Sequence, residues 1–259
     1  MKRIITLLLT AVFLLSLAGC ALIPQKGSLE LHEGALDSEF TALRLDVDVA
    51  TITVTPGDAF RVEYGLCNEP EIATAGDGTL TIREKAADHW WDSIHFPQDI
   101  QPYVKVTVPE GTALSLLDVT VDVGDVEVSG LALGMLHADA DVGDLKLQSI
   151  TVQGAVDFSA DVGNVGCREM AVTGAVTVEV DTGDLTFEGS AARIDAETDV
   201  GNMQFLLSGA AADWAMALEA DVGSVIVDGM DQGNRYASGG GQHQLDAETD
   251  TGDISVEFQ

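Results

Sequence analysis

Residues 122–125 read Asp-Val-Gly-Asp, and close variants of this phrase recur toward the end of the chain. The seven copies begin at Asp122, Asp141, Asp161, Asp181, Asp199, Asp221 and Asp250. Successive copies therefore begin 19, 20, 20, 18, 22 and 29 residues apart. A period near 20 residues is typical of a solenoid, in which each unit buries its apolar face only by stacking on its neighbours.

Apolar residues alternate with polar ones on both sides of each phrase. In the first copy, Leu117 precedes the phrase, and Val126 and Val128 follow it. This period of two predicts a strand before the phrase and a strand after it. The Gly supplies a positive φ, and the first Asp can accept a hydrogen bond from the backbone amide two residues on. We therefore predict an all-β, single-domain β-solenoid, or β-helix, built from rungs of about 20 residues.

The N-terminus has the features of an exported lipoprotein. Lys2 and Arg3 precede a short apolar run, and small residues precede Cys20. The run is too short to span a membrane comfortably and is typical of a secretory signal. The tetrad Leu-Ala-Gly-Cys at 17–20 resembles the bacterial lipobox, which implies cleavage before Cys20 and diacylglycerol on its sulfur. We expect a lipid anchor on the outer face of a bacterial membrane, at the cell envelope; an ordinary signal peptide is the alternative.

The chain is strongly acidic. It has 12 basic and 43 acidic residues, and loss of residues 1–19 would leave 10 basic residues and a formal charge of −33. Such a surface repels nucleic acid and anionic lipid headgroups, and it favours metal cations, cationic peptides or basic proteins. The alternative is that the charge only keeps the strands soluble and prevents edge-to-edge aggregation.

The solenoid is predicted to begin near residue 41. Residues 43–54 match the repeat at every inward position, with Asp48 as the first Asp and Ala50 in place of the Gly, so they form an eighth, degenerate rung. The predicted divisions are 1–19 signal peptide, 20–40 lipidated Cys20 and tether, 41–115 irregular rungs and 116–259 regular rungs.

The spaces between the phrases predict further elements. Strands are expected at 60–64, 79–82 and 103–108, and a third short strand per rung is suggested by the similarity of 152–156 to 172–176. The insertion at 228–244 contains three consecutive glycines and predicts a mobile loop. The last rung then has no cap, so its exposed edge predicts end-to-end self-association.

The order of these segments resembles a bacterial domain-of-unknown-function family labelled "putative adhesin". The likeness rests on the early Leu-x-Val-x-Val rung, on Thr79-Leu80-Thr81-Ile82, on the segment Tyr-Val-Lys-Val-Thr-Val-Pro-Glu-Gly at 103–111, and on the Asp-x-Gly-Asp rungs. It covers about residues 41–259. The resemblance implies a β-helix-like domain at the bacterial cell envelope, and it supplies no catalytic residues.

Stacked acidic turns are the first candidate site. Equivalent Asp residues on neighbouring rungs would lie about 4.8 Å apart, where two charges repel by roughly 0.9 kcal/mol in water. They either stay solvated, strengthen turn hydrogen bonds, or bind cations such as calcium, which needs six or more oxygen ligands. The candidate calcium ligands are Asp122, Asp125, Asp141, Asp144, Asp161, Asp181 and Asp184. Asn164, Asn202 and Ser224 at the last position of other copies favour plain turn chemistry instead.

A cluster of aromatic and imidazole side chains is the second candidate. His89, Trp90, Trp91 and His95 lie within residues 86–102, which interrupt the strand pattern and predict a long loop. They would form a platform for sugar or peptide, or a pair of metal ligands. The alternative is a structural role, in which these side chains cover an otherwise exposed edge of the core. The two histidines have no third metal ligand nearby, which favours this alternative.

The cysteines are too few for a disulfide scaffold. Cys167 occupies an inward position and is predicted to be a buried apolar thiol. A bridge between Cys67 and Cys167 is the alternative in an oxidising compartment.

We predict a non-catalytic binding, adhesin-like or structural module that needs no cofactor unless calcium binds. Its expected partners are the membrane, through the lipid anchor, and an envelope protein or glycan. The first alternative is capture of cations or cationic antimicrobial peptides during envelope stress. The second is a β-helix enzyme that acts on polysaccharide. The chain has no recognisable Ser-His-Asp, Cys-His or nucleotide-binding motif, and its negative surface would repel polyuronates.

Overall fold

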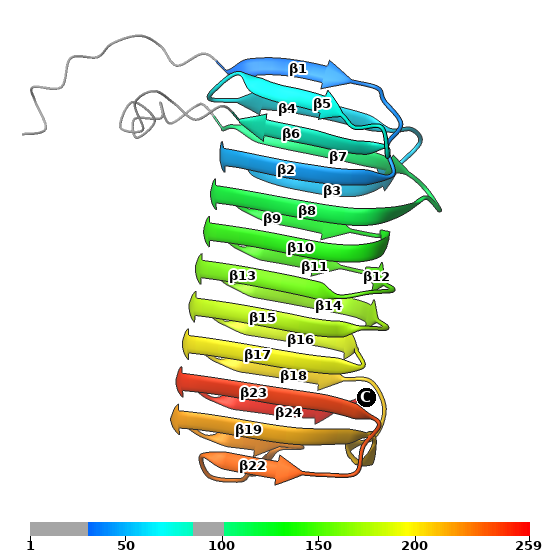
Figure 1. Ribbon diagram of the computed structural model, residues 1–259. Coiled ribbons are helices and arrows are strands. Elements are labelled where there is room, and N and C mark those ends of the chain that lie inside the picture. Colours follow the sequence, from blue (N-terminus) through cyan, green and yellow to red (C-terminus); the bar gives the residue numbers. More distant parts are fainter. Residues whose placement is uncertain (1–30, 85–100) are drawn as a thin grey trace, which may run out of the picture. The chain divides into compact units, whose positions relative to one another are not determined.

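The computed structural model describes residues 31–84 and 101–259. Residues 31–259 form one compact unit. Within it the chain winds as a flattened coil, and each regular rung contributes one strand before the Asp-x-Gly turn and one strand after it (Figure 1). We call the strands before the turn the A sheet and the strands after it the B sheet. The predicted β-solenoid is therefore confirmed.

The A sheet stacks in an order that the register of its pairs defines. From one end to the other its strands are β5 (Pro70–Thr74), β6 (Thr79–Glu84), β2 (Ala42–Val49), β8 (Ala113–Val123), β10 (Ala132–Val142), β13 (Val156–Val162), β15 (Ala175–Thr182), β17 (Arg193–Val200), β23 (His243–Thr251), β19 (Trp214–Val222) and β22 (Arg235–Ser238). All neighbours are parallel except β5 with β6 and β19 with β22, which are antiparallel.

The B sheet runs alongside in the same direction of stacking. Its strands are β1 (His32–Leu36), β4 (Arg61–Leu66), β7 (Tyr103–Pro109), β3 (Thr51–Gly57), β9 (Val126–Ser129), β11 (Leu145–Gln148), β14 (Val165–Val172), β16 (Leu185–Ser190), β18 (Met203–Leu207), β24 (Ile254–Phe258), β20 (Val225–Val227) and β21 (Met230–Asp231). A third short strand, β12 (Thr151–Val152), pairs with both β10 and β14 and is a separate element in that rung alone among the described residues. A single 3-10 turn, η3 (Ala211–Asp213), precedes β19.

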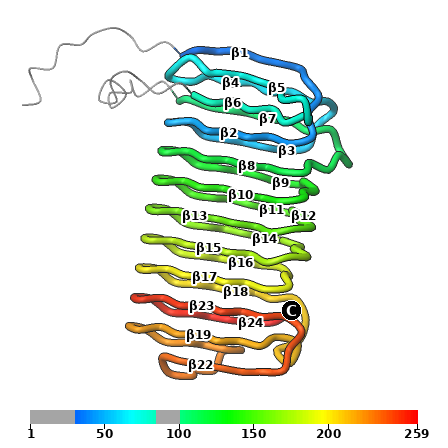
Figure 2. Tube along the Cα trace, viewed as in Figure 1, coloured from blue at the N-terminus to red at the C-terminus, as the bar shows by residue number. Residues whose placement is uncertain are grey.

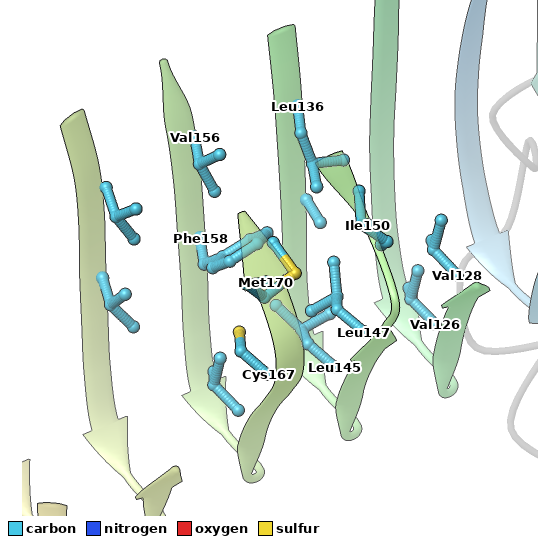
Figure 3. Close-up of a cluster of buried hydrophobic side chains, with 14 of the residues drawn as sticks. Val126, Val128, Leu136, Leu145, Leu147, Ile150, Val156, Phe158, Cys167 and Met170 are labelled. Atoms are coloured by element: carbon cyan, nitrogen blue, oxygen red, sulfur yellow. The ribbon is translucent and has the colours of Figure 1, made fainter. Parts of the chain in front are cut away.

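The core fills the space between the two sheets. Leu136 pairs in register with Leu117 on one side and Val156 on the other, and all three side chains are buried. Figure 3 shows Leu136, Val156 and Phe158 of the A sheet facing residues of the B sheet, among them Cys167. Because equivalent inward residues stack in columns, each rung is dry only when it has neighbours on both sides.

The turns stack so closely that glycine is required in the regular rungs. A Cβ on Gly183, whose φ is 155°, would lie 1.8 Å from the carbonyl oxygen of Gly163. Ala50 occupies the same place in the first rung, where the neighbour outside it, β6 and β7, has no Asp-x-Gly turn. The degenerate rung predicted at Asp48 is therefore confirmed, and the sequence between β6 and β7 has no glycine at a matching turn phrase.

Two rungs lie out of sequence order. The last rung of the chain, β23 with β24, is inserted between β17 with β18 and β19 with β20. In Figure 2 its red trace lies between the yellow and orange rungs. The first rung, β2 with β3, is likewise enclosed between β6 with β7 and β8 with β9.

Two predictions about the C-terminal part are therefore corrected. The last rung in sequence is internal, so it is not an uncapped end. Residues 228–244 are not simply a mobile loop, since they contain β21 and β22, which pair antiparallel with β20 and β19 and cover the end of the stack. Antiparallel strands do this well because they turn back on the edge that a further parallel rung would use.

The other end is covered in a similar way. β1 pairs antiparallel with β4, β4 with β7, and β5 with β6. β4, β6 and β7 correspond to the strands predicted at 60–64, 79–82 and 103–108. β1 falls within residues 20–40, which we expected to be a tether throughout.

Candidate functional site

The outward side chains of the A sheet form acidic columns. In the column two residues before the first Asp of the turn, four consecutive strands carry Glu179, Glu197, Glu248 and Glu219, in that order of stacking. Neighbours in such a column are about 4.8 Å apart. Insertion of β23 between β17 and β19 is what makes the run of four continuous.

A hollow of about 530 Å³ lies over these glutamates. Its floor spans β15, β17, β23 and β19, and its lining includes Arg235 and Tyr236 of β22. Ala217 and Ala237 also line it, and their short side chains leave room beside the longer residues. The hollow therefore has an acidic floor, and Arg235 stands at one end of it.

Two arginines neutralise part of this surface. Arg193 donates to Asp195, with Nε–Oδ2 at 2.5 Å and Nη2–Oδ1 at 2.6 Å, and its Nη2 lies 2.8 Å from Asp246 Oδ2. The hydrogen bond with Asp195 raises the pKa of Arg193. Arg235 forms an ion pair with Glu219.

The remaining three glutamates of the column have no such partner. Within the described residues, no ion pair or hydrogen bond engages the side chains of Glu179, Glu197 and Glu248. The floor of the hollow thus holds three adjacent carboxylates without a counter-charge. A ligand that brings positive charge would relieve their mutual repulsion.

The last position of each turn phrase forms a separate ladder. The backbone N–H of Asn164 donates to Asp144 Oδ1 at 2.9 Å, and the N–H of Asp184 donates to Asn164 Oδ1 at 2.9 Å. The same bond repeats from rung to rung. In order of stacking the ladder reads Asp125, Asp144, Asn164, Asp184, Asn202, Asp253, Ser224.

Charged and neutral residues alternate along most of this ladder. The exception is the adjacent pair Asp125 and Asp144, and Lys146 Nζ lies 3.3 Å from a carboxylate oxygen of each. The hydrogen bond from Asn164 N–H lowers the pKa of Asp144. The ladder is therefore a device that satisfies backbone donors without stacking uncompensated charges.

The candidate calcium ligands belong to two different columns. Asp125, Asp144 and Asp184 are in the ladder, where their oxygens already accept backbone hydrogen bonds. Asp122, Asp141, Asp161 and Asp181 begin the turns and are exposed. Over residues 31–84 and 101–259, no group of three or more His, Cys, Asp or Glu side chains is arranged to hold a metal ion. The calcium sites stay a prediction.

Burial and like charge perturb some carboxylates on the A sheet. Desolvation raises the pKa of Asp122, with further contributions from Asp48 and Asp141. Desolvation also raises the pKa of Asp48, and Glu84 adds to it. Glu84 is buried and accepts hydrogen bonds from the backbone N–H groups of Asp48 and Asn68, at 3.1 and 2.5 Å.

The cysteines are not bridged. Cys67 and Cys167 are both free and buried, so the alternative of a disulfide between them is wrong. Cys167 is fully buried among apolar residues, as predicted from its inward position, and burial raises the pKa of its thiol. Desolvation, with Glu84 and Asp48 nearby, raises the pKa of Cys67 to about 12. Neither thiol is a nucleophile at neutral pH.

Several predicted site residues lie outside the described part of the chain. These are Cys20, His89, Trp90, Trp91 and His95. Their assignments stay predictions.

The acidic hollow was not identified from the sequence. Arg235 and Tyr236 lie in residues 228–244, which contain enough glycine to predict a loop. The glutamates recur two residues before Asp181, Asp199, Asp221 and Asp250, so their column was visible. What was hidden is that Glu248 stacks between Glu197 and Glu219.

Among the described residues, no helix is long and apolar enough to cross a membrane.

The comparisons with known proteins identify a family. A family model described as Toastrack DUF4097 matches residues 40–256. No curated protein matches the chain.

Several solved structures are similar to the chain at low sequence identity. A "putative cell adhesion protein" from Clostridium sporogenes is 13% identical, with a TM-score of 0.47 over 89% of this chain and 100% of that one. A "putative adhesin" from Bacteroides fragilis is 14% identical, with a TM-score of 0.46 over 89% and 97%. A "putative lipid binding protein" from Parabacteroides distasonis is 12% identical, with a TM-score of 0.46 over 90% and 95%.

Proposed function

The chain belongs to the Toastrack DUF4097 family, and from that premise we propose that it is a lipid-anchored, non-catalytic binding module of the bacterial cell envelope. Its partner is a basic peptide or a basic segment of an envelope protein. The acidic hollow of the A sheet is the binding surface.

The column of unpaired glutamates carries this proposal. Glu179, Glu197 and Glu248 stand on adjacent strands of a rigid sheet, so their positions are fixed before a ligand arrives. Each neighbouring pair repels by roughly 0.9 kcal/mol in water and by more at the edge of a hollow. Lysine or arginine side chains would remove that repulsion and form charge-assisted hydrogen bonds.

Attachment to the membrane through Cys20 is part of the proposal. The support is the leader sequence, with its charged start, apolar run and Leu-Ala-Gly-Cys tetrad. Expression in a bacterium should give a membrane-bound protein that incorporates labelled fatty acid. Cys20→Ser should abolish the label, and label that persists in this variant would contradict attachment at Cys20.

The binding test uses the full chain in mild detergent and an octalysine peptide, measured by calorimetry. The double variant Glu197→Gln, Glu248→Gln should weaken binding by about tenfold or more, because it removes two charge-assisted contacts. The matched control Asp141→Asn, Asp161→Asn removes the same charge from exposed turn positions outside the hollow. Equal effects of the two double variants would show that only net charge matters and would contradict the hollow as the site.

A second candidate is recognition through a strand edge, favoured by the positions of β22 and β5. Within the described residues, each pairs on one side only, with β19 and β6 respectively. A partner strand added there would be held by main-chain hydrogen bonds. Salt separates the two mechanisms, since binding in the acidic hollow should weaken steeply with ionic strength and strand addition should hardly respond.

A further inference from the structure

The two sheets differ in charge. The outward positions of the A sheet carry the acidic columns described above. The outward positions of the central B sheet are mostly uncharged, and they include two basic residues, Lys146 and Arg168. The formal charge of −31 is therefore unevenly distributed. The acidic columns of the A sheet repel acidic sugars, whereas the central B sheet has no such columns.

A second hollow, of about 500 Å³, lies on this sheet. It extends across β3, β9, β11 and β14, on the opposite sheet from the acidic hollow. Its lining mixes apolar, charged and uncharged polar residues, and the last group includes the hydroxyl and amide side chains of Thr53, Ser129 and Gln148.

Gly166 opens this hollow. It occupies an outward position of β14, where the neighbouring rungs carry Lys146 and Thr186. A Cβ at Gly166 would lie 3.9 Å from the carbonyl oxygen of Leu145, an ordinary contact, and its φ is not in the left-handed region. Neither a turn nor a close approach of backbones requires glycine at this position. The absence of a side chain at Gly166 leaves open the space that the hollow occupies.

A β-bulge sets the position of Arg168 at the edge of the same space. The register of β14 against β16 shifts between Cys167 and Met170. Glu169 within this shift has φ 53°, and its carboxylate accepts a hydrogen bond from Ser149 Oγ. Bulges redirect the side chains that they contain and are common beside binding sites.

Arg168 has no partner for its charge. Its side chain is exposed and lines the hollow, and no ion pair or hydrogen bond engages its guanidinium among the residues that the structure describes. Lys146 differs, because Asp125 and Asp144 hold its ammonium group in the turn ladder. Glu127, the other acidic residue of the lining, lies two rungs from Arg168. The free cation in this hollow is thus the guanidinium.

These groups match the chemistry of an acidic sugar. A guanidinium binds a carboxylate in a bidentate manner. Hydroxyl and amide side chains both donate and accept hydrogen bonds, as sugar hydroxyls require. Among the described residues, no aromatic side chain lines the hollow, so these residues offer no platform for a nucleobase. The acidic columns of the A sheet lie on the opposite side of a sandwich about 10 Å thick, a distance over which salt screens exposed charges.

We propose that the hollow over Gly166 binds a carboxylate-bearing sugar unit, with Arg168 on the carboxylate. The site is independent of the acidic hollow, so either can fail without the other.

The test is calorimetry of the full chain in mild detergent with trigalacturonate, up to about 10 mM, where a site with millimolar Kd is well occupied. We expect saturable binding, weaker by about tenfold or more in Arg168→Gln. Gly166→Val should abolish binding by filling the hollow. The control Thr186→Val places the same side chain on the next rung and should bind as the unmodified protein does.

The melting temperature of each variant shows whether it is folded. Gly166→Val should melt no lower than the unmodified protein, because valine has a high propensity for strands. If Gly166→Val lowers the melting temperature, the proposal is judged only on the calorimetric binding of the Arg168→Gln variant. Absence of binding, equal binding of neutral maltotriose, or equal binding of acetate alone would each overturn the proposal. Binding unchanged in both the Gly166 and Arg168 variants would also overturn it.

Discussion

The middle of the solenoid and its two ends are built from the same rung but follow different rules of order. From β8 to β18, each rung stacks on the rung that precedes it in sequence. At the ends, β2 and β23 are enclosed by strands from elsewhere in the chain. The comparison shows that a repeat dictates how a rung folds but not which rung becomes its neighbour.

The turn ladder indicates what selects the neighbours at the C-terminal end. In sequence order, Asn202 would be followed by Ser224 and then Asp253. In the structure Asp253 lies between them, and its backbone and side chain bond to both. The inserted rung thus continues the alternation of charged and neutral residues that the middle of the stack displays.

Removing the inserted rung should have the largest effect. Truncation after Gln242 deletes β23 and β24, with the buried side chains of Leu245, Ile254 and Val256. Burial of three such side chains contributes about 5 kcal/mol or more, comparable to the stability of a whole domain. We expect the rung of β19 and β20 to lose its protection in hydrogen exchange.

The control removes more residues from the middle. Excision of 156–193 joins Ala155 to Ile194, which keeps the inward positions aligned and preserves the alternation of the ladder. Because solenoid stability is approximately a sum over neighbouring rungs, this shorter protein should still unfold in one transition. A truncated chain that melts like the intact one would contradict the importance of insertion.

A glycine in the middle should be far less replaceable than its counterpart at the end. Gly183→Ala would place a Cβ 1.8 Å from a backbone oxygen, so we expect a loss of about 2–3 kcal/mol in urea denaturation. Ala50→Gly, in the enclosed first rung, should cost about 1 kcal/mol or less. Similar losses at the two positions would mean that stacking of turns does not set the requirement.

The ladder offers a smaller test of the same contrast. Asn164→Asp would create four consecutive carboxylates in the middle, from Asp125 to Asp184, at a cost of about 1–2 kcal/mol at pH 7. The new carboxyl should have a raised pKa, so the penalty exists above that pKa and disappears as the pH falls below about 4. Ser224→Asp, at the end of the ladder, has one carboxylate neighbour and should cost about half as much. Denaturation at both pH values measures the difference.

The dependence of native stability on pH should be the smallest effect. Desolvation raises the pKa of Asp48, Asp122 and Asp139 above the ordinary value of 3.8. Their ionised forms are disfavoured in the folded state, so stability increases as the pH falls from 7 toward 4. Asp144, whose pKa is lowered, contributes stability that is lost only below about 4.

We therefore expect Tm to rise slightly as the pH falls from 7 toward 4. Asp48→Asn in the enclosed rung and Asp139→Asn in the regular stack should each reduce that rise. A Tm that falls over this interval would contradict the assignment.

Much of the fold follows from residues that the sequence displays. The column of inward positions, the Gly of each turn and the degenerate rung at Asp48 were predictable, because the period of two and the turn chemistry are local. The order of rungs was not, because Ile194, Leu245 and Met216 are interchangeable as inward residues. The 29-residue spacing before Asp250 was the one visible sign of an exception.

The candidate sites were less predictable for the same reason. The acidic column depends on Glu248 lying beside Glu197, which is a consequence of rung order. The hollow on the B sheet depends on an absent side chain at Gly166 and a bulge at Arg168, and neither disturbs the repeat enough to be recognised.

The insertion of β23 also governs when the protein can finish folding. During synthesis β19 emerges before β23, and the edge of β17 is then its available partner. Met216 and Leu218 of β19 are as apolar as the residues of β23 that pair with β17 in the final structure. We therefore expect β19 to pair with β17 provisionally, in the place that β23 later takes. That pairing must open to admit β23 and β24, which makes completion of the stack a late, non-local step.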